Sequence, residues 1–341
     1  MPSAHIHNPR ARIQLRSRTL EVRGPVVDDH GNDTGDLLLR EIPLRDLERM
    51  SITEGVSFTS AALAAMMRAD IPINLFSYNG RFLGAFRPAG PPNGRSRLTH
   101  YQRNLDPGFC LEIARRLVDA KILNQVRVIQ RLATNRGQPG ATAREAAMLK
   151  AHRASVATVG HIDEVRGHEG AAAAAYFGAW ARFLPAEFPF ERRSTRPPLN
   201  PVNACISFGA TLIYQEMAGF LQSHGLDAAL GCLHATEDGR WSLALDLIEP
   251  FRPALVEALA VDLFSRRMLG AGCFEERNGG VYLNASGRKK FLLQYEKRMD
   301  REFMSEQLAH RTSLRQQLEE QALQFKRALT DVRQFEPFLM N

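Results

Sequence analysis

One histidine and two carboxylates lie close together in the segment ALGCLHATEDGRWSLALDLIEPFRP, residues 229–253. His234 ends an apolar stretch, and a short predicted helix that follows Ser242 carries Asp246 and Glu249. Their spacing of three residues places both carboxylates on one helical face. Arg252, at the same spacing again, is placed to pair with Glu249. An imidazole with two carboxylates forms an oxygen-rich site that suits Mn²⁺ or Mg²⁺ better than zinc.

A further carboxylate, Glu169, interrupts an apolar stripe at helical spacing in residues 162–183. A carboxylate that faces a protein core is costly unless it is paired or binds a metal. The small side chains of residues 170–175 allow a ligand to come close. Two simpler interpretations stay open: Glu169 at the edge of the stripe, reaching water or an arginine, and an isolated His234 with a structural role.

Basic residues outnumber acidic ones by 44 to 37, which gives a formal net charge of +7. Such an excess suits a polyanionic partner, and three clusters concentrate it. Each cluster alone is also explained as a solvated face, but together they predict phosphate binding. The candidate DNA-binding residues are Arg95, Arg97, Arg103, Lys121, Arg192, Arg193, Arg252, Arg288, Lys289 and Lys290.

The elements that position these residues predict an α+β protein with two domains. Residues 1–95 form a small β-rich domain, with extended segments at 18–22 and 37–42 and a helix that Thr59 or Ser60 caps. Asn79-Gly80 predicts a hairpin within residues 71–86, and residues 86–97 read as a linker. Residues 96–341 form a larger all-α domain, with helices within 111–132, 144–183, 203–224 (capped by Asn203), 254–269 and 288–330.

Several other classes of protein are disfavoured. The sequence has no phosphate-binding loop, dinucleotide fingerprint, H-E-x-x-H or G-x-S-x-G motif. Its most apolar stretch, residues 170–180, is far shorter than the ~20 residues that a bilayer requires. Because residues 1–15 also lack the apolar core of a signal peptide, we expect a cytoplasmic protein without membrane contact. The four cysteines form no C-x-x-C pair and are predicted to be buried thiols: Cys110, Cys205, Cys232 and Cys273.

Five segments, in order, resemble motifs of Cas1, the integrase of the CRISPR adaptation module. They span nearly the whole chain, which makes the resemblance specific. The chain departs from the family at Asn200, where Asp is common. The segments are IPINLFSYNGRFLGAF (71–86), Lys121-Ile-Leu-Asn124-Gln125, GHEGAAAAAYF (167–177), RPPLNPVNACISFGATLIY (196–214), and GCLHA with SLALDLIEPFRP (231–235 and 242–253).

The resemblance implies that Glu169, His234 and Glu249 bind Mn²⁺ or Mg²⁺. It places Asp246 in the same catalytic segment, either supporting these ligands or acting at the metal, and His234 could also shuttle protons. The implied activity is a metal-dependent DNA endonuclease and integrase that inserts new spacers into a CRISPR array by 3′-hydroxyl attack on a phosphodiester. The implied partners are double-stranded and branched DNA, a second copy of the chain bound through the β-rich domain, and Cas2. The alternatives are a non-catalytic DNA-binding scaffold of the same fold and a hydrolase of small phosphoesters.

Overall fold

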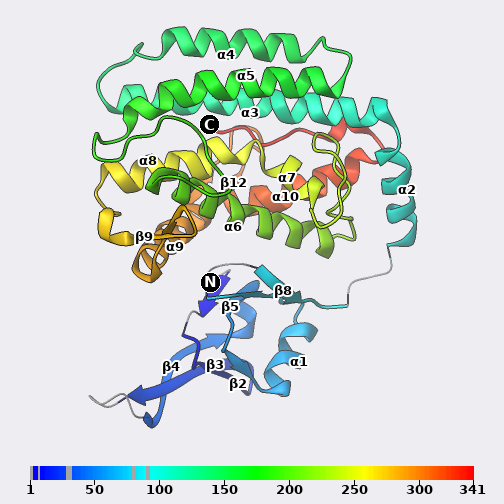
Figure 1. Cartoon of the computed structure of the whole chain (residues 1–341). Coiled ribbons are helices and arrows are strands. Elements are labelled where there is room, and N and C mark those ends of the chain that lie inside the picture. Colours follow the sequence, from blue (N-terminus) through cyan, green and yellow to red (C-terminus); the bar gives the residue numbers. More distant parts are fainter. Residues whose placement is uncertain (1–2, 7, 28–32, 79–81, 90–92) are drawn as a thin grey trace. The chain divides into compact units, whose positions relative to one another are not determined.

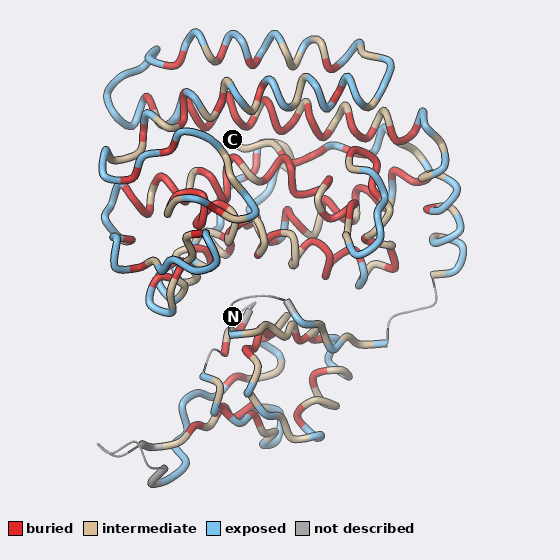
Figure 2. The backbone as a smooth tube through the Cα atoms, viewed as in Figure 1, coloured by how far each residue is buried: buried red, intermediate tan, exposed pale blue. Residues whose placement is uncertain are grey.

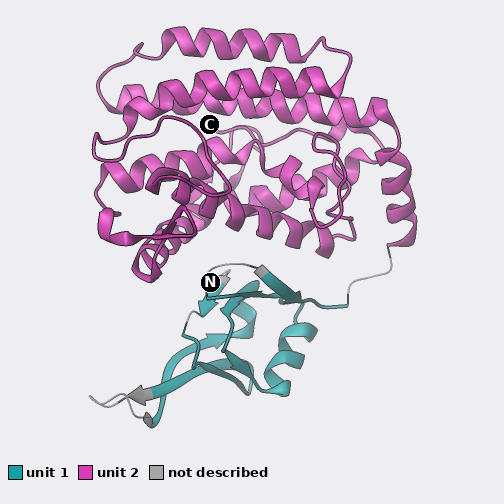
Figure 3. Ribbon diagram, viewed as in Figure 1, with its two compact units in different colours: residues 1–92 teal, residues 93–341 magenta. Residues whose placement is uncertain are grey.

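The computed structural model describes residues 3–6, 8–27, 33–78, 82–89 and 93–341. The chain divides into two compact units, residues 1–92 and 93–341 (Figure 3). Within the described ranges, no helix is both long enough and apolar enough to cross a membrane.

The described part of the first unit contains two four-stranded sheets and one helix (Figure 1). One sheet has the order β1-β5-β7-β8 and the other β4-β3-β2-β6. Buried side chains of both sheets and of the helix form one hydrophobic cluster, in which Ile13, Met50 and Met66 are fully buried. The elements are β1 (Ser3–Ile6), β2 (Arg12–Arg16), β3 (Thr19–Val27), β4 (Asp33–Pro43), β5 (Arg49–Thr53), β6 (Ser57–Phe58), α1 (Ser60–Arg68), β7 (Ile73–Phe76) and β8 (Phe82–Phe86).

Local signals in this unit are confirmed. The predicted extended segments fall on β3 and β4, except that Arg18 precedes β3, and β7 pairs antiparallel with β8 as the hairpin pattern predicts. The Asn79-Gly80 turn itself lies outside the described residues. Of the two candidate caps of α1, the structure selects Thr59, whose side chain accepts a hydrogen bond from the backbone N–H of Ala62. That bond satisfies one of the free N–H groups at the start of the helix.

The second unit is mostly helical (Figure 1). Its α-helices are α2 (Gly94–Asn104), α3 (Pro107–Asn135), α4 (Ala143–Val156), α5 (Ile162–Trp180), α6 (Pro201–Ser223), α7 (Ser242–Ile248), α8 (Ala258–Ser265), α9 (Ala285–Asp300) and α10 (Leu314–Ala328). Four short strands complete it: β9 (Phe274–Arg277), β10 (Gly280–Leu283), β11 (Glu302–Met304) and β12 (Arg311–Ser313). A π-helical segment, η3 (Arg252–Glu257), leads into α8, and a 3₁₀ turn, η5 (Val332–Gln334), follows α10.

The structure corrects three details of the sequence reading. The second unit is not entirely helical, because β9 pairs with β10 and β11 pairs with β12. The second of these hairpins is the break within the helical pattern predicted over 288–330, and it separates α9 from α10. Residues 94–97 belong to α2 and not to a linker. The cap of α6 is Asn200, which accepts from the backbone N–H of Asn203. Asp serves equally well as a cap, which accounts for the exchange with the family's residue.

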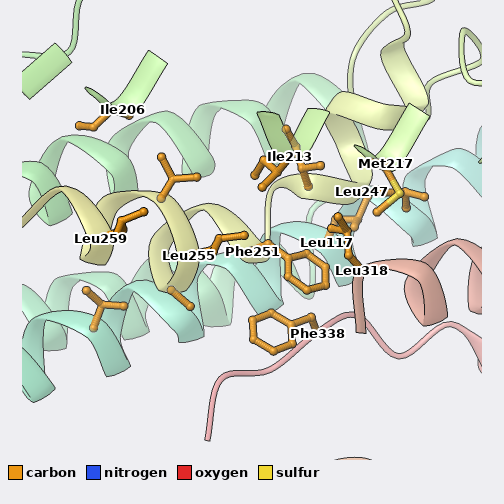
Figure 4. Packing of buried hydrophobic residues seen from close by; sticks show 14 of the residues in the cluster. Leu117, Ile206, Ile213, Met217, Leu247, Phe251, Leu255, Leu259, Leu318 and Phe338 are labelled. Atoms are coloured by element: carbon orange, nitrogen blue, oxygen red, sulfur yellow. The ribbon is translucent and has the colours of Figure 1, made fainter. Parts of the chain in front are cut away.

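The core of the second unit lies among α3, α5, α6, the segment from α7 to α8, and α10. Figure 2 shows that buried stretches run along these elements, while α4 is more exposed. In the close view of Figure 4, Leu117 of α3, Ile213 of α6 and Leu318 of α10 lie around Leu247 and Phe251. This packing surrounds the segment that carries Asp246 and Glu249.

Candidate metal centre

Four separate parts of the second unit supply the candidate site. Glu169 comes from the middle of α5, and His234 lies in the loop between α6 and α7. Asp246 lies on α7, and Glu249 is the residue immediately after that helix. A fifth residue, Lys121 of α3, joins them. The packing of α3 against α5 and α7 therefore assembles the site from distant parts of the chain.

Lys121 links the two glutamates. Its Nζ donates to Oε1 of Glu169 and to Oε2 of Glu249, which lie 48 and 128 residues away in the sequence. Only 6% of the Lys121 side chain is exposed. Burial alone lowers the pKa of Lys121, but the charges of Glu249 and Glu169 outweigh burial and raise it. The lysine is therefore charged at neutral pH and holds both carboxylates around one positive charge.

Arg252 takes the other oxygen of Glu249, as the spacing predicts: its Nη1 lies 2.8 Å from Oε1. Burial alone raises the pKa of Glu249, but the charges of Arg252 and Lys121 outweigh burial and hold that pKa well below its usual range. Glu249 is therefore an ionised carboxylate in a buried position. Each carboxylate oxygen offers about two acceptor positions, so each oxygen of Glu249 retains one for a further ligand.

Asp246 holds the histidine loop. Its fully buried carboxylate accepts from the backbone N–H groups of Cys232 and Leu233 at 2.6 and 2.9 Å, both at Oδ2. Its Oδ1 accepts from the backbone N–H of His234 at 2.9 Å and lies 2.6 Å from the ring Nδ1. These four bonds use the acceptor positions of both oxygens. Of the two roles left open by the sequence, the geometry favours support of His234 over direct metal binding.

The bond to Asp246 also orients the imidazole. When Nδ1 donates to Asp246, Nε2 is the ring nitrogen that remains to bind a metal or a proton, and it makes no hydrogen bond to any described residue. Burial alone lowers the pKa of His234, but the hydrogen bond to Asp246 and its charge outweigh burial and raise it. A carboxylate behind a histidine is the usual support of a metal-binding imidazole.

The donor chemistry of these residues fits a divalent cation. Two carboxylates already share one cationic group, Lys121, and the ring of His234 is oriented by a buried carboxylate. Among the described residues, no three His, Cys, Asp or Glu side chains lie close enough together to hold a metal ion as they stand. The argument for a divalent cation therefore rests on the types of ligand atom, two carboxylates and an imidazole, and on the hydrogen bonds that hold these side chains in place.

Comparison with known proteins identifies the family. The family model described as "CRISPR associated protein Cas1" matches residues 4–297. The chain belongs to the Cas1 family. It is 32% identical over 305 residues to a CRISPR-associated endonuclease Cas1 of Thermus thermophilus, covering 89% of each protein. It is also 32% identical over 297 residues to a Cas4 exonuclease/Cas1 endonuclease fusion of Geobacter sulfurreducens; that match covers 85% of this chain and 53% of the fusion.

Two solved structures share the fold of this Cas1-family chain. A casposase bound to an integration product matches with a TM-score of 0.77 at 18% identity, over 97% of this chain and 91% of the casposase. A chain of a partial Cas6-RT-Cas1–Cas2 complex matches with a TM-score of 0.73 at 24% identity, over 99% of both chains. The α+β prediction is therefore confirmed.

Lys121 is the residue whose place at the site the sequence reading missed. The sequence predicts a DNA contact for Lys121; in the structure its ammonium is buried and bonds two site carboxylates, so the DNA contact stays a prediction. The sequence spacing could have predicted that Lys121 is buried, because it follows Leu117 by four residues and so lies on the same, buried face of α3. Glu257, which the sequence did not single out, is also buried near the site, and this burial raises its pKa.

The other predicted basic residues separate into exposed and internal ones. Arg193 bonds the side chains of Asn203 and Ser207, and burial lowers its pKa to about 10. Arg103 is partly buried and donates to the backbone carbonyl of Leu329. Arg252 pairs with Glu249, and Arg288 donates to the backbone carbonyl of Leu283 at the end of β10. The exposed members, which remain available to a polyanion, are Arg95, Arg97, Arg192, Lys289 and Lys290.

Proposed function

We propose that this Cas1-family endonuclease and integrase works with Mn²⁺ or Mg²⁺ held by Glu169, His234 and Glu249. The reaction is insertion of a short DNA fragment into a CRISPR array. A 3′-hydroxyl of the fragment forms a new P–O bond at a phosphodiester of the array, and the 3′-oxygen of the cut strand leaves. The observation that supports this best is the pair of glutamates bridged by Lys121, together with a histidine that Asp246 orients.

The chain's own residues prepare the site for this reaction. Lys121 and Arg252 place two positive charges beside the carboxylates, which reduces the repulsion of an incoming phosphodiester. Asp246 keeps Nε2 of His234 available. A bound divalent cation supplies charge stabilisation at the phosphate oxygens and lowers the pKa of the attacking hydroxyl. Because DNA itself supplies the nucleophile, no serine or cysteine of the chain is required.

The proposed partners are DNA, Cas2 and a second copy of the chain. The exposed basic residues, with Arg95 and Lys289 as examples, offer charge to a DNA backbone and no base readout. A similar chain occurs in a solved complex with Cas2, which supports the same partner for this chain. By resemblance to the family, we assign the pairing of the two copies to the first unit, which is the β-rich domain.

The test is cleavage and joining of a branched DNA that carries a single-stranded flap, in Mn²⁺, in Mg²⁺ and in EDTA. The variant is Glu169→Gln, which keeps the shape of the side chain and removes its charge. Asp163→Asn, an exposed carboxylate on the same helix, is the matched control. We expect metal-dependent activity in the wild type and in Asp163→Asn, and a loss of about 100-fold or more in Glu169→Gln with unchanged DNA binding.

Two results would contradict the proposal. Full activity of Glu169→Gln would remove Glu169 from the metal site. DNA binding without any strand cutting or joining by the wild type, with and without Cas2, would favour the non-catalytic scaffold.

A further inference from the structure

The last seven residues of the chain, Phe335–Asn341, form a segment that we call the tail. It lies beyond the part of the chain that matches the Cas1 family model, residues 4–297. The tail has no helix or strand, yet Phe335 and Phe338 are buried in the core of the second unit. Arg127 and Arg131 of α3 donate to the backbone carbonyls of Met340 and Asn341. The tail is therefore bound along α3, the helix that carries Lys121.

Two buried amide side chains join the tail to the segment that carries Glu249. Asn124 donates from Nδ2 to the carbonyl oxygens of Pro250 and Phe338, at 2.7 and 2.9 Å. Its Oδ1 accepts from the backbone N–H of Met340 at 2.8 Å. Gln321 of α10 also bonds both segments: its Nε2 donates to the carbonyl of Leu247, and its Oε1 accepts from the N–H of Phe338 at 2.7 Å.

A ring contact reinforces these bonds. Phe251 and Phe338 stack with their centroids 4.3 Å apart and their planes 7° from parallel. Figure 4 shows the two rings one above the other, with Phe338 on the passing tail. Phe251 follows Glu249 by two residues, so this contact fixes the backbone directly beside the carboxylate.

The need for such partners follows from the end of α7. The last carbonyls of a helix find no backbone N–H donor within that helix. Pro250 also has no backbone N–H with which to continue the hydrogen bonds of α7. In the last turn of α7 the carbonyl of Leu247 accepts from the amide of Gln321, and just beyond the helix the carbonyl of Pro250 accepts from the amide of Asn124. Glu249 lies between these two bonded carbonyls, and each amide is in turn held by the tail.

We infer that the tail is a positioning element of the active site, which holds the backbone of residues 247–251 so that Glu249 meets its partners. This inference rests on the proposed function of Glu249 as a metal ligand. Supports of metal ligands typically contribute about 10- to 100-fold to metal affinity or activity. Loss of the tail contact is expected to have an effect of about tenfold, at the lower end of that range, because Lys121 and Arg252 continue to hold the carboxylate.

The test compares two buried phenylalanines of the tail in the full-length protein. Phe338→Leu removes the ring stack on Phe251, whereas Phe335→Leu removes a ring that contacts Phe325 of α10. Four quantities are measured: the dissociation constant for Mn²⁺ by calorimetry without DNA, kcat and KM for flap DNA, and amide hydrogen exchange within residues 247–251. The melting temperature of each variant shows whether the two substitutions are equally destabilising.

We expect Phe338→Leu to weaken Mn²⁺ binding and to lower kcat about tenfold each, with KM for DNA unchanged and with faster exchange at 247–251. Phe335→Leu should lower the melting temperature to a similar extent and leave all four quantities as in the wild type. Equal changes in both variants would overturn the inference, because the tail would then act only on stability. If the wild type binds no Mn²⁺, the proposed metal site fails, and exchange at 247–251 alone decides whether the tail holds this segment.

Discussion

Replacing Lys121 with methionine tests the charge balance of the site. The substitution preserves length and apolar packing but removes the cation that Glu169 and Glu249 share. Removal of one partner of a buried ion pair costs about 3–5 kcal/mol. Arg252 still compensates Glu249, and Glu169 is 26% exposed and reaches water, so we expect a loss near the lower limit, about 3 kcal/mol.

Urea unfolding followed by tryptophan fluorescence measures this loss. The protein has two tryptophans, Trp180 and Trp241, and both lie in the second unit, so the signal reports the unit that contains the site. Lys150→Met on the exposed surface of α4 is the matched control and should change the free energy of unfolding by less than about 0.5 kcal/mol.

Added Mn²⁺ provides a second measurement on Lys121→Met. In Lys121→Met both carboxylates remain, but the ammonium that repels a metal ion is gone. Mn²⁺ should therefore stabilise Lys121→Met more than Lys150→Met. The reasoning is refuted if Lys121→Met loses less than about 1 kcal/mol, because the ammonium would then not be compensating buried carboxylates. Equal stabilisation of both variants by Mn²⁺ would refute the link between this lysine and the metal site.

Three further predictions concern the second unit. Burial lowers the pKa of His100 to about 4, although the charge of Asp227 opposes this shift. As the pH falls, His100 therefore takes up a proton in the unfolded chain before it does so in the folded protein. Stability should therefore be complete above pH ~6.5 and fall by about 3 kcal/mol towards pH 4, a loss that urea titrations of His100→Leu should not show. Arg315 is buried against three carboxylates, so Arg315→Met should lose about 3–5 kcal/mol in urea unfolding. The exposed Arg333→Met should lose less than ~0.5 kcal/mol, and a similar loss in both would show that burial of Arg315 is unimportant. Asn200→Ala should lower the melting temperature by the equivalent of about 1 kcal/mol, whereas Asn200→Asp should retain the cap of α6; equal loss in both would exclude the capping role.

Local sequence patterns correctly predicted much of the fold. Helical periodicity located α1 and α3, and alternation around a turn signal located the β7–β8 hairpin. The three-residue spacing of Glu249 and Arg252 predicted their ion pair. Each of these features depends on residues within a few positions of one another, whose geometry is set by the helix or strand itself. The β11–β12 hairpin was missed because its short strands carry no clear period.

Only the tertiary structure decided which partners the buried polar side chains bind. Lys121 lies on the inner face of α3, but its partners come from α5 and from the end of α7. Asp246 could equally have faced a metal; the folded loop instead brings the N–H groups of residues 232–234 and the ring of His234 to its carboxylate. The tail meets Asn124 from more than 200 positions away. Periodicity determines which side of a helix is buried, whereas the identity of a partner depends on how distant elements pack, because burial forces each polar group to find one there.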